Sequence, residues 1–511
     1  MGHNRTTAAF SYLLLAALLI FSFFYNLSKP PIFIWDEARR ANDALQMYLR
    51  GDWIINYYDD NPQTWSVKSP ILLLLQVGCM HLFGVGEFAI RFPSAFAAFT
   101  IGSVIWLFCT RYFGKPWIGF LSGSVFAATY AWVFNHAGRT GDYDALLTLF
   151  SFSYSICFYT VCINSKKRWH ALFWLFLTAA VLIKGAAGLF FLPGLVVFTI
   201  VQKRFTFFLR HRLTYIGAAC FVAVIGGYYA FREWYAPGFL AAVNGNELGG
   251  RYLTQLEGHG LNFFYYAKTI VAWRYTYWVG FLLLSFVVGF FHHSVLVRRL
   301  TLFNLVLTGP FFLIISSAQT KLSWYDLPLY PFWSIQIGLL LFYAWQWLQQ
   351  KYLSHQQQWI SNGTAIVLFL LLFALPLRTI FIHNQYRNTA FPWDVHAQER
   401  KQALFLQQAI QNNMNLNQHT FLYEDYDRHI HFYVKLLQSK DVNVQLVNTI
   451  DSIRPGAKVV VSEKTTAQKL QQQFEARPVA EKWDCTVYLI DRKKNDAKHL
   501  GLQKENNNQQ P

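Results

Sequence analysis

The sequence predicts a mainly α-helical polytopic membrane protein with a small α/β domain at its C-terminal end. Of the 511 residues, 54% are hydrophobic and only 14% are charged, and the mean hydropathy is +0.22. Many apolar segments approach the ~20 residues that a membrane-crossing helix needs, so we expect about 11–13 transmembrane helices. After about residue 385 the chain turns polar, with the spacings of short strands and amphipathic helices.

Eleven apolar segments are predicted to span the membrane. They cover residues 8–27, 88–110, 117–135, 144–163, 169–183, 186–201, 213–231, 276–296, 301–318, 325–347 and 360–382. The first is expected to be retained, since no A-x-A-like cleavage site follows it. A twelfth apolar run, PILLLLQVGCMHLF at 70–83, is shorter, and runs of about 10–14 residues are more often interfacial or re-entrant than spanning.

The distribution of Lys and Arg decides between these two arrangements of residues 70–83. If this run lies along the membrane surface and the N-terminus is cytoplasmic, the later basic clusters all face the cytoplasm, as the positive-inside rule requires. These clusters are Arg111 and Lys115; Lys166, Lys167 and Arg168; Lys203, Arg204, Arg210 and Arg212; Arg298 and Arg299; and Lys351. The net charge of +17 is therefore topological, and it does not indicate a nucleic-acid partner.

The same topology places the chemically suggestive residues of five segments on the outer face. They are Asp36, Glu37, Arg39, Arg40, Lys68, Asp142, Asp144, His259, Lys321 and Tyr325. Ionisable groups at the edge of a bilayer are costly, so such a cluster is a functional hypothesis by default. The six cysteines form no CxxC pair or metal-ligand spacing, and we interpret them as small core residues.

Several short motifs, taken in order, are similar to those of a known enzyme family. They are WDEAR, GDWI, VKSP and FGVGEFAIRFPSA in the first outer loop, then RTGDYDALLTLF, LIKGAAGLFFLP, LEGHGLNFFYY and TKLSWYDLPLYP. Over residues 1 to about 385 the chain resembles the GT-C membrane glycosyltransferases related to the protein O-mannosyltransferases and to the aminoarabinose transferase that modifies lipid A.

The resemblance implies a fold, a reaction and a location. The fold is GT-C, with interfacial helices in the first outer loop. The reaction is an inverting transfer of a sugar from a polyprenyl-phosphate donor to a lipid, glycan or protein acceptor. The location is a membrane, here the bacterial inner membrane, with the site and the C-terminal domain facing the periplasm.

Two departures from the family pattern bear on the site. Val67 stands where the family usually carries an acid before its Lys-Pro-Pro, which weakens the case for aminoarabinose transfer and for a metal held there. The GDYD stretch offers two acids where the family pattern has one; Asp144 is the aligned residue and Asp142 its neighbour. No cofactor is required by the sequence, no metal ligands are assigned, and a divalent metal is compatible with it.

The chemistry of such a transfer assigns roles to the candidate residues. The acceptor needs a base, and a carboxylate partly desolvated at the membrane edge has its pKa raised towards the useful range. The leaving phosphate needs cations and hydrogen-bond donors. The predicted roles are catalysis for Asp36 (the general base), Asp144 and Glu37; binding of the donor phosphate for Arg39, Lys68, Lys321 and Tyr325; and substrate binding for Asp142, Lys184 and His259.

Most of these residues also have a plainer structural interpretation. Asp36 can pair with Arg39 or Arg40 at the start of a helix, where Glu37 also suits the first turn. Asp144 can be an N-cap, Lys184 can direct its ammonium to the interface, and a lone loop His is more often neither a metal ligand nor a sugar contact. The alternative function is a polytopic transporter or lipid flippase, but we find no internal repeat of the kind that such proteins usually carry.

The polar C-terminal part is predicted to form a separate domain. Strands are expected at 420–425, 442–448, 457–463 and 485–491, and helices at 398–411 and 466–476. The predicted division is a transmembrane glycosyltransferase domain at 1–384, an extracytoplasmic α/β domain at 385–500 and a disordered tail at 501–511.

The topology can be tested by labelling single added cysteines. We expect a cysteine that replaces Ser317 to react with an impermeant thiol reagent from outside intact cells, and one that replaces Lys167 to stay unlabelled, because only the second faces the cytoplasm. The chain without an added cysteine is the control. Labelling in the reverse order would overturn the topology.

Overall fold

The computed structural model of the chain describes residues 2–53, 57–58, 61–62, 67–245, 252, 255, 261–353, 356–386, 399–422 and 428–494. The chain divides into two compact units. The first comprises Met1–Leu27, Pro62–Leu75 and Arg91–Asn384, and the second Ser28–Asn61, Gln76–Ile90 and Gln385–Pro511. The predicted domain boundaries stay predictions, as does the disorder of the tail, which lies outside the described residues.

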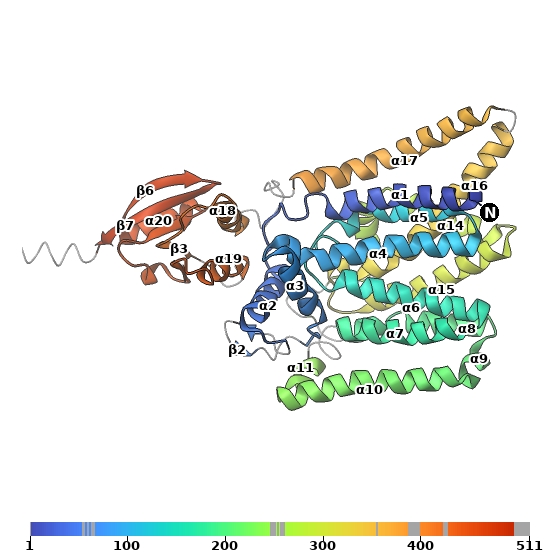
Figure 1. Cartoon of the computed structure of the whole chain (residues 1–511), viewed down its shortest axis with the longest axis horizontal. Coiled ribbons are helices and arrows are strands. Elements are labelled where there is room, and N and C mark those ends of the chain that lie inside the picture. Colours follow the sequence, from blue (N-terminus) through green and yellow to red (C-terminus); the bar gives the residue numbers. More distant parts are fainter. Residues whose placement is uncertain are drawn as a thin grey trace, which may run out of the picture. The chain divides into compact units, whose positions relative to one another are not determined.

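The first unit is built from helices that run alongside one another (Figure 1). Its α-helices are α1 (Gly2–Phe24), the larger part of α4 (Glu87–Phe113), α5 (Pro116–Ala127), α6 (Asp144–Asn164), α7 (Lys167–Lys184), α8 (Leu192–Val201), α9 (Phe205–Arg210), α10 (Arg212–Tyr235), α11 (Phe239–Val243), α13 (Tyr265–Thr269), α14 (Val279–Phe291), α15 (Val295–Ser317), α16 (Tyr330–Tyr352) and α17 (Gln358–Tyr386). Short turns of other helix types are η1 (Tyr130–Trp132), η2 (Gly185–Leu189), η4 (Ile270–Arg274) and η5 (Ser323–Leu329).

The predicted fold class is confirmed, with fewer full-length helices than expected. Each of the eleven predicted spans contains a helix, and among the described residues eight helices are long and apolar enough to cross a membrane. Counting the pair Tyr265–Arg274 and Val279–Phe291, which bends by 111°, gives nine rather than 11–13. The remaining predicted spans are apolar for longer than they are helical: α5 covers only Pro116–Ala127 and α8 only Leu192–Val201.

The 70–83 run forms α3 (Ile71–Phe83), a helix of 13 residues. This length is below what crossing a membrane requires, in line with the predicted interfacial position, which stays a prediction. The cysteines are free; Cys79, Cys109, Cys157, Cys162 and Cys485 are buried as expected of core residues. The interpretation is wrong for Cys220, which is exposed on α10.

Close packing of the helices depends on small and polar side chains. A Cβ added at Gly338 of α16 would lie 2.6 Å from the backbone nitrogen of Ser122 of α5, so this crossing needs glycine. Gln336 donates to the Ser285 carbonyl (3.0 Å) and to the Thr301 hydroxyl (2.9 Å), which ties α16 to α14 and α15. Such interhelical contacts replace the hydrophobic driving force that is missing between helices in lipid.

Two buried arginines donate to backbone carbonyls at the end of α1 and in the residues just after it. Arg91 donates to the Leu27 carbonyl at 3.0 Å, and Arg139 donates to those of Ser22 and Tyr25 at 3.2 and 2.8 Å. The final carbonyls of a helix have no partner within it, so cationic side chains stabilise this end. Both arginines belong to motifs that carry the family resemblance, and here they perform a structural task.

The second unit combines part of the first outer loop with the C-terminal residues. It contains α2 (Asp36–Arg50), the last part of α3, β1 (Tyr57–Tyr58), α18 (Glu399–Gln411), β3 (His419–Leu422), α19 (Arg428–Gln438), β4 (Val444–Val447), η6 (Ile450–Ser452), β5 (Lys458–Val461), α20 (Lys464–Gln473), β6 (Phe474–Lys482) and β7 (Cys485–Lys493); β2 (Asn61–Pro62) lies at its boundary. The strands form a sheet in the order β4-β3-β5-β7-β6, parallel from β4 to β5 and antiparallel beyond.

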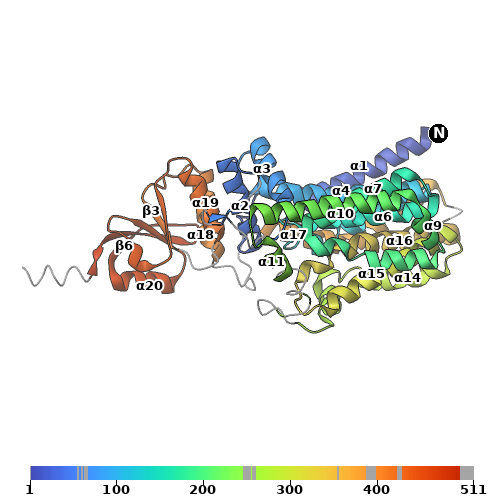
Figure 2. The same ribbon diagram turned by 90° about the horizontal axis from the view of Figure 1, so that it is seen from below.

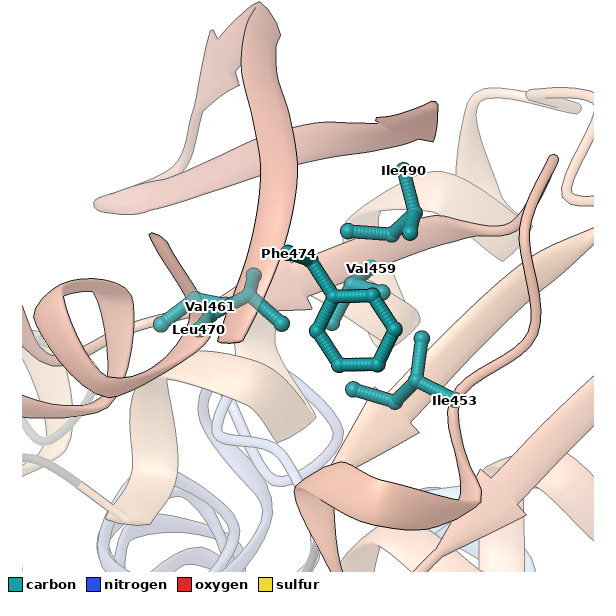
Figure 3. Packing of buried hydrophobic residues seen from close by; sticks show 6 residues of the cluster. All are labelled: Ile453, Val459, Val461, Leu470, Phe474 and Ile490. Atoms are coloured by element: carbon teal, nitrogen blue, oxygen red, sulfur yellow. The ribbon is translucent and has the colours of Figure 1, made fainter. Parts of the chain in front are cut away.

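The C-terminal α/β character is as predicted, with two errors. The predicted helix at 466–476 is wrong from Phe474 onwards, where β6 begins. Trp483 and Asp484 both have positive φ and form the two-residue turn that pairs β6 with β7, a geometry whose twist suits antiparallel strands. Phe474 then enters the core between sheet and α20 with five other apolar residues (Figure 3). Helix α19 was not expected.

Candidate active site

A cavity in the first unit brings together residues from widely separated segments. Four of the predicted site residues line it: Lys68, Asp144, Lys184 and Tyr325. The rest of its wall is mostly apolar, formed by Leu147, Ala186, Ala187, Phe190, Phe311, Ile314, Ile315, Ala318 and Pro328, with Tyr252 and Thr320. The cavity therefore offers charged groups and an apolar surface to the same ligand.

Asp144 and Lys184 form a buried ion pair at this cavity. The Lys184 ammonium lies 2.5 Å from Asp144 Oδ1, and the Asp144 side chain is only 2% exposed. The other carboxylate oxygen, Oδ2, is buried and has no hydrogen-bond partner among the described residues. Breaking a buried pair by removing one partner typically costs about 3–5 kcal/mol, because it leaves an uncompensated charge.

This ion pair corrects two of the plainer interpretations. Asp144 is not the N-cap of α6 but its first residue; Tyr143 precedes it, and no side-chain hydrogen bond caps the helix. Lys184 does not direct its ammonium towards an interface, because that group pairs with the carboxylate and lies 5.3 Å from the centre of the Tyr325 ring. Both residues instead hold charge inside the protein.

Lys68 approaches the same region from the first outer loop. Its ammonium lies 5.0 Å from the centre of the Tyr143 ring, within the range of a cation–π interaction. Tyr143 is fully buried, and its hydroxyl donates to the Ser69 carbonyl at 3.4 Å. The residue before Asp144 thus positions the loop that carries Lys68.

Asp142 is engaged by a histidine that sequence reasoning missed. One of its oxygens contacts His136 Nδ1, and the other accepts from the Tyr143 backbone N–H at 2.7 Å. The His136 ring stacks on Trp324, with centroids 3.5 Å apart and planes at 15°. His136 lies six residues before Asp142, so its proximity along the chain was a usable signal. This pair offers two ligand types that divalent metals accept.

A buried network fixes the turn η5, which carries Trp324 and Tyr325. Arg274, at the end of η4, donates to both oxygens of Asp326 at 2.7 and 2.5 Å, and the Tyr330 hydroxyl donates to the same carboxylate at 2.6 Å. Arg274 and Asp326 are fully buried. Arg274 and Asp326 are 52 residues apart in the chain, so no local pattern could predict their pairing.

Lys321 does not line the cavity. Its ammonium donates to the Ala318 carbonyl at 2.5 Å and to the Leu261 carbonyl at 2.9 Å, and the residue is buried. Burial lowers the pKa of this amine. These contacts give Lys321 a structural role that competes with the predicted binding of a phosphate. His259 lies outside the described residues.

The remaining predicted residues lie on α2 in the second unit. Asp36 is the first residue of the helix, and its carboxylate lies 3.7 Å from the Arg40 guanidinium, as the plainer interpretation expected. Glu37 is buried and accepts from the Phe33 backbone N–H at 2.8 Å, a contact that fits a role in positioning the helix. Arg39 is half-buried. That all predicted site residues share one surface stays a prediction.

Asp43, further along α2, is fully buried and was not singled out from the sequence. Burial raises the pKa of its carboxyl group from 3.8 to about 7, although Arg40 and Arg39 on the same helix and Lys435 on α19 lower it. The charge of this one carboxyl group therefore changes near neutral pH, next to two arginines of the WDEARR stretch.

Comparisons with known proteins agree with the family resemblance that the motifs indicate. Residues 67–229 match the family of dolichyl-phosphate-mannose-protein mannosyltransferases. A protein of Aquifex aeolicus (strain VF5), described as uncharacterized, is 27% identical over 327 residues, which are 63% of this chain and 62% of that protein. The match thus spans less than two thirds of the Aquifex protein.

Two solved structures are similar in fold. ArnT from Cupriavidus metallidurans, in a crystal structure bound to undecaprenyl phosphate, superposes with a TM-score of 0.68 over 93% of this chain and 97% of ArnT, at 17% identity. The Archaeoglobus fulgidus oligosaccharyltransferase, tethered to an acceptor peptide, gives a TM-score of 0.51 at 10% identity, over 86% of this chain and 63% of that one. At these identities the similarity establishes the fold alone.

The structural similarity confirms the fold class predicted from the sequence, a mainly helical polytopic membrane protein of the GT-C fold with a small C-terminal sheet domain. The family match over residues 67–229 agrees with the resemblance that the motifs indicate. Among proteins of this fold, the chain is similar in structure to ArnT over nearly its whole length.

The raised pKa of Asp43 predicts a dependence of stability on pH. A carboxyl group whose pKa is higher in the folded than in the unfolded chain makes the protein less stable as the pH rises from about 3.8 to about 7. Asp43→Asn keeps the size and removes the charge. Its melting temperature in detergent should therefore exceed that of the wild type by more at pH 8 than at pH 5.

The control is Asp441→Asn, at an exposed position of the same unit whose φ of 60° asparagine accepts. It should melt like the wild type at both pH values. Equal differences at pH 5 and pH 8 for Asp43→Asn would mean that the folded chain does not hold this carboxyl group protonated.

Proposed function

We propose that the protein is an inverting glycosyltransferase that moves a sugar from a polyprenyl-phosphate donor to an acceptor at the extracytoplasmic face of a membrane. The observation that carries this proposal is the cavity of the first unit, where the Lys68 ammonium and the Lys184–Asp144 ion pair lie in an otherwise largely apolar wall. A polyprenyl phosphate has the matching chemistry, since it joins an anionic head to a long hydrocarbon chain.

The relatives support the same donor class. ArnT was crystallised with undecaprenyl phosphate, and the matching family is named for the use of dolichyl-phosphate mannose. Both carriers are polyprenyl phosphates. The sugar and the acceptor of this chain are left as classes: a lipid, a glycan or a protein that presents a hydroxyl or an amine. We propose a bacterial inner membrane and a periplasmic site, as the distribution of basic loops favours.

In the proposed reaction the acceptor attacks the anomeric carbon from the side opposite the phosphate. The new bond to the acceptor oxygen or nitrogen forms as the bond to the phosphate oxygen breaks, so the configuration inverts. Asp36 takes the proton of the acceptor, and the lipid phosphate leaves with the electron pair of the broken bond. Electrostatic stabilisation of that leaving group is the largest task of the site.

The cationic residues perform this task in the proposal. Lys68 and Arg39 contact the phosphate, Lys as a compact charge and Arg through its planar fork. Lys184 adds a further cation at the cavity, and Asp144 keeps it charged and in place. Tyr325 contributes a hydroxyl from η5. Asp142 and His259 remain proposed substrate contacts, and Glu37 a catalytic candidate behind Asp36 and Asp144.

Replacing the phosphate-binding cations should weaken donor binding. Each of Lys68→Ala and Arg39→Ala removes a charge-assisted contact worth about 1.5–3 kcal/mol, so the dissociation constant for a polyprenyl phosphate should rise by roughly 10- to 150-fold. Binding is measured on purified protein in detergent with undecaprenyl phosphate as the probe.

Lys167→Ala is the matched control, because Lys167 is an exposed lysine at the start of α7 and lies outside the proposed site. Its affinity should equal that of the wild type. If neither Lys68→Ala nor Arg39→Ala differs from this control, the donor binds elsewhere.

A single variant distinguishes Asp36 as the general base from Asp36 as a merely structural partner of Arg40. Asp36→Asn preserves the size of the side chain but cannot take a proton, so transfer should fall by roughly 10²–10⁴-fold while donor binding survives. Asp441→Asn is again the control, and folding is checked by thermal melting. A folded Asp36→Asn protein with near-normal turnover would reduce Asp36 to the partner of Arg40 seen at the start of α2.

A further inference from the structure

The C-terminal part of the chain packs directly on the helix that carries the proposed base. Helices α19 and α2 lie side by side in the second unit (Figures 1 and 2). The buried side of α2 includes Ala38, Ala41 and Leu45, and the Asn42 amide donates to the Arg428 carbonyl of α19 at 2.7 Å. Helix α2, which carries the proposed base, is thus packed against α19, whose residues come almost 400 positions later in the chain.

A second contact holds the irregular segment that leads into α2. The Tyr433 hydroxyl of α19 accepts from the Ile32 backbone N–H at 3.0 Å and donates to Glu87 Oε1 at 2.5 Å. The three residues are buried. One hydroxyl therefore joins the C-terminal helix, the entry segment of α2 and the first residue of α4 within the second unit.

Gln407 of α18 completes this network. Its amide donates to the same Glu87 oxygen at 2.8 Å and to the Ser28 carbonyl at 3.2 Å. The Arg400 guanidinium of the same helix lies 5.6 Å from the centre of the Phe33 ring. Two C-terminal helices thus contact residues 28–33 through their backbone and side chains. We call Tyr433, Gln407, Glu87, Ile32 and Ser28 the docking network.

The backbone next to the network explains why such support is needed. Trp35, the residue before Asp36, has φ 73° and ψ −124°, a conformation that a bulky side chain rarely adopts. Strained residues of this kind persist only where the surrounding structure over-determines them, and they concentrate at functional sites. Here the N–H groups of Ile32 and Phe33, just before the strained residue, are held by Tyr433 and Glu37.

We propose that the C-terminal domain is a positioning part of the transferase, which holds Asp36 in its working position through the docking network and above all through the Tyr433 hydroxyl. Tyr433 is a positioning residue and not a catalytic one, since it acts through Asp36. This inference rests on the proposed function, because Asp36 as the base is part of that proposal.

A double-mutant cycle separates positioning from a general loss of folding. Tyr433→Phe keeps the ring and removes only the hydroxyl, and it should lower kcat about tenfold. In the Asp36→Asn background the same change should cost less than about twofold, because there is no longer a base to position. A merely destabilising change would lower the active fraction equally in both backgrounds. The matched control is Tyr488→Phe, on β7 of the C-terminal sheet. It should leave kcat unchanged in both the wild-type and the Asp36→Asn backgrounds.

Hydrogen exchange on the full chain tests the contact independently of turnover. Amides of residues 28–50 should exchange about tenfold faster in Tyr433→Phe than in the wild type or Tyr488→Phe. Unchanged exchange would overturn the inference whatever the rates. Faster exchange with an equal loss of rate in both Asp36 backgrounds would also overturn it. If the Asp36→Asn variant keeps full turnover, Asp36 is not the base. The inference then fails because the proposed function fails, and this outcome is distinguished by the single Asp36→Asn variant.

Discussion

Charged groups inside an apolar helical protein must find partners, and the Asp144–Lys184 pair is where this constraint has the most consequences. Neither residue can be buried alone at acceptable cost. Their pairing ties the first residue of α6 to the last residue of α7, and it brings an ammonium group into the wall of the cavity. The ammonium group that we propose as a phosphate contact is therefore also part of how the helices are held together.

The same constraint organises the surroundings of the cavity. Arg274 and Tyr330 both donate to the carboxylate of Asp326 in η5, the turn that also carries Trp324 and Tyr325. Trp324 stacks on the histidine that contacts Asp142. Buried contacts of this kind preorganise the side chains around the cavity, as the pairing of Lys184 with Asp144 shows. The cost is that substitutions at Arg274 or Asp326 are expected to affect the cavity without touching a ligand.

The second unit follows a different rule. It has an apolar core of its own between the sheet and α20. In addition, Gln407 of α18 and Tyr433 of α19 form hydrogen bonds with the segment before α2. Within the docking network, Tyr433 and Gln407 each bind a backbone group of residues 28–32 and the side chain of Glu87. In the proposed arrangement, a domain with no catalytic motif contributes to catalysis by holding the segment that leads into α2.

The sequence by itself determined what hydrophobicity and short motifs encode: the membrane class, the position of a helix in each of the eleven apolar runs, the polar C-terminal α/β part, and the candidates Lys68, Asp144, Lys184 and Tyr325, which line one cavity. It overestimated helix length at α5, α8 and α14, because an apolar run records burial and not the continuity of a helix.

Only the tertiary structure decided which charges pair. Nothing local connects Asp144 with Lys184, Arg274 with Asp326, or Tyr433 with Glu87, which are 40, 52 and 346 residues apart. Lys321 looked like a free cation in its motif and is bonded to two backbone carbonyls. Two side chains pair only when folding brings them within a few ångströms. The sequence shows which ionisable side chains are present but not which of them come that close.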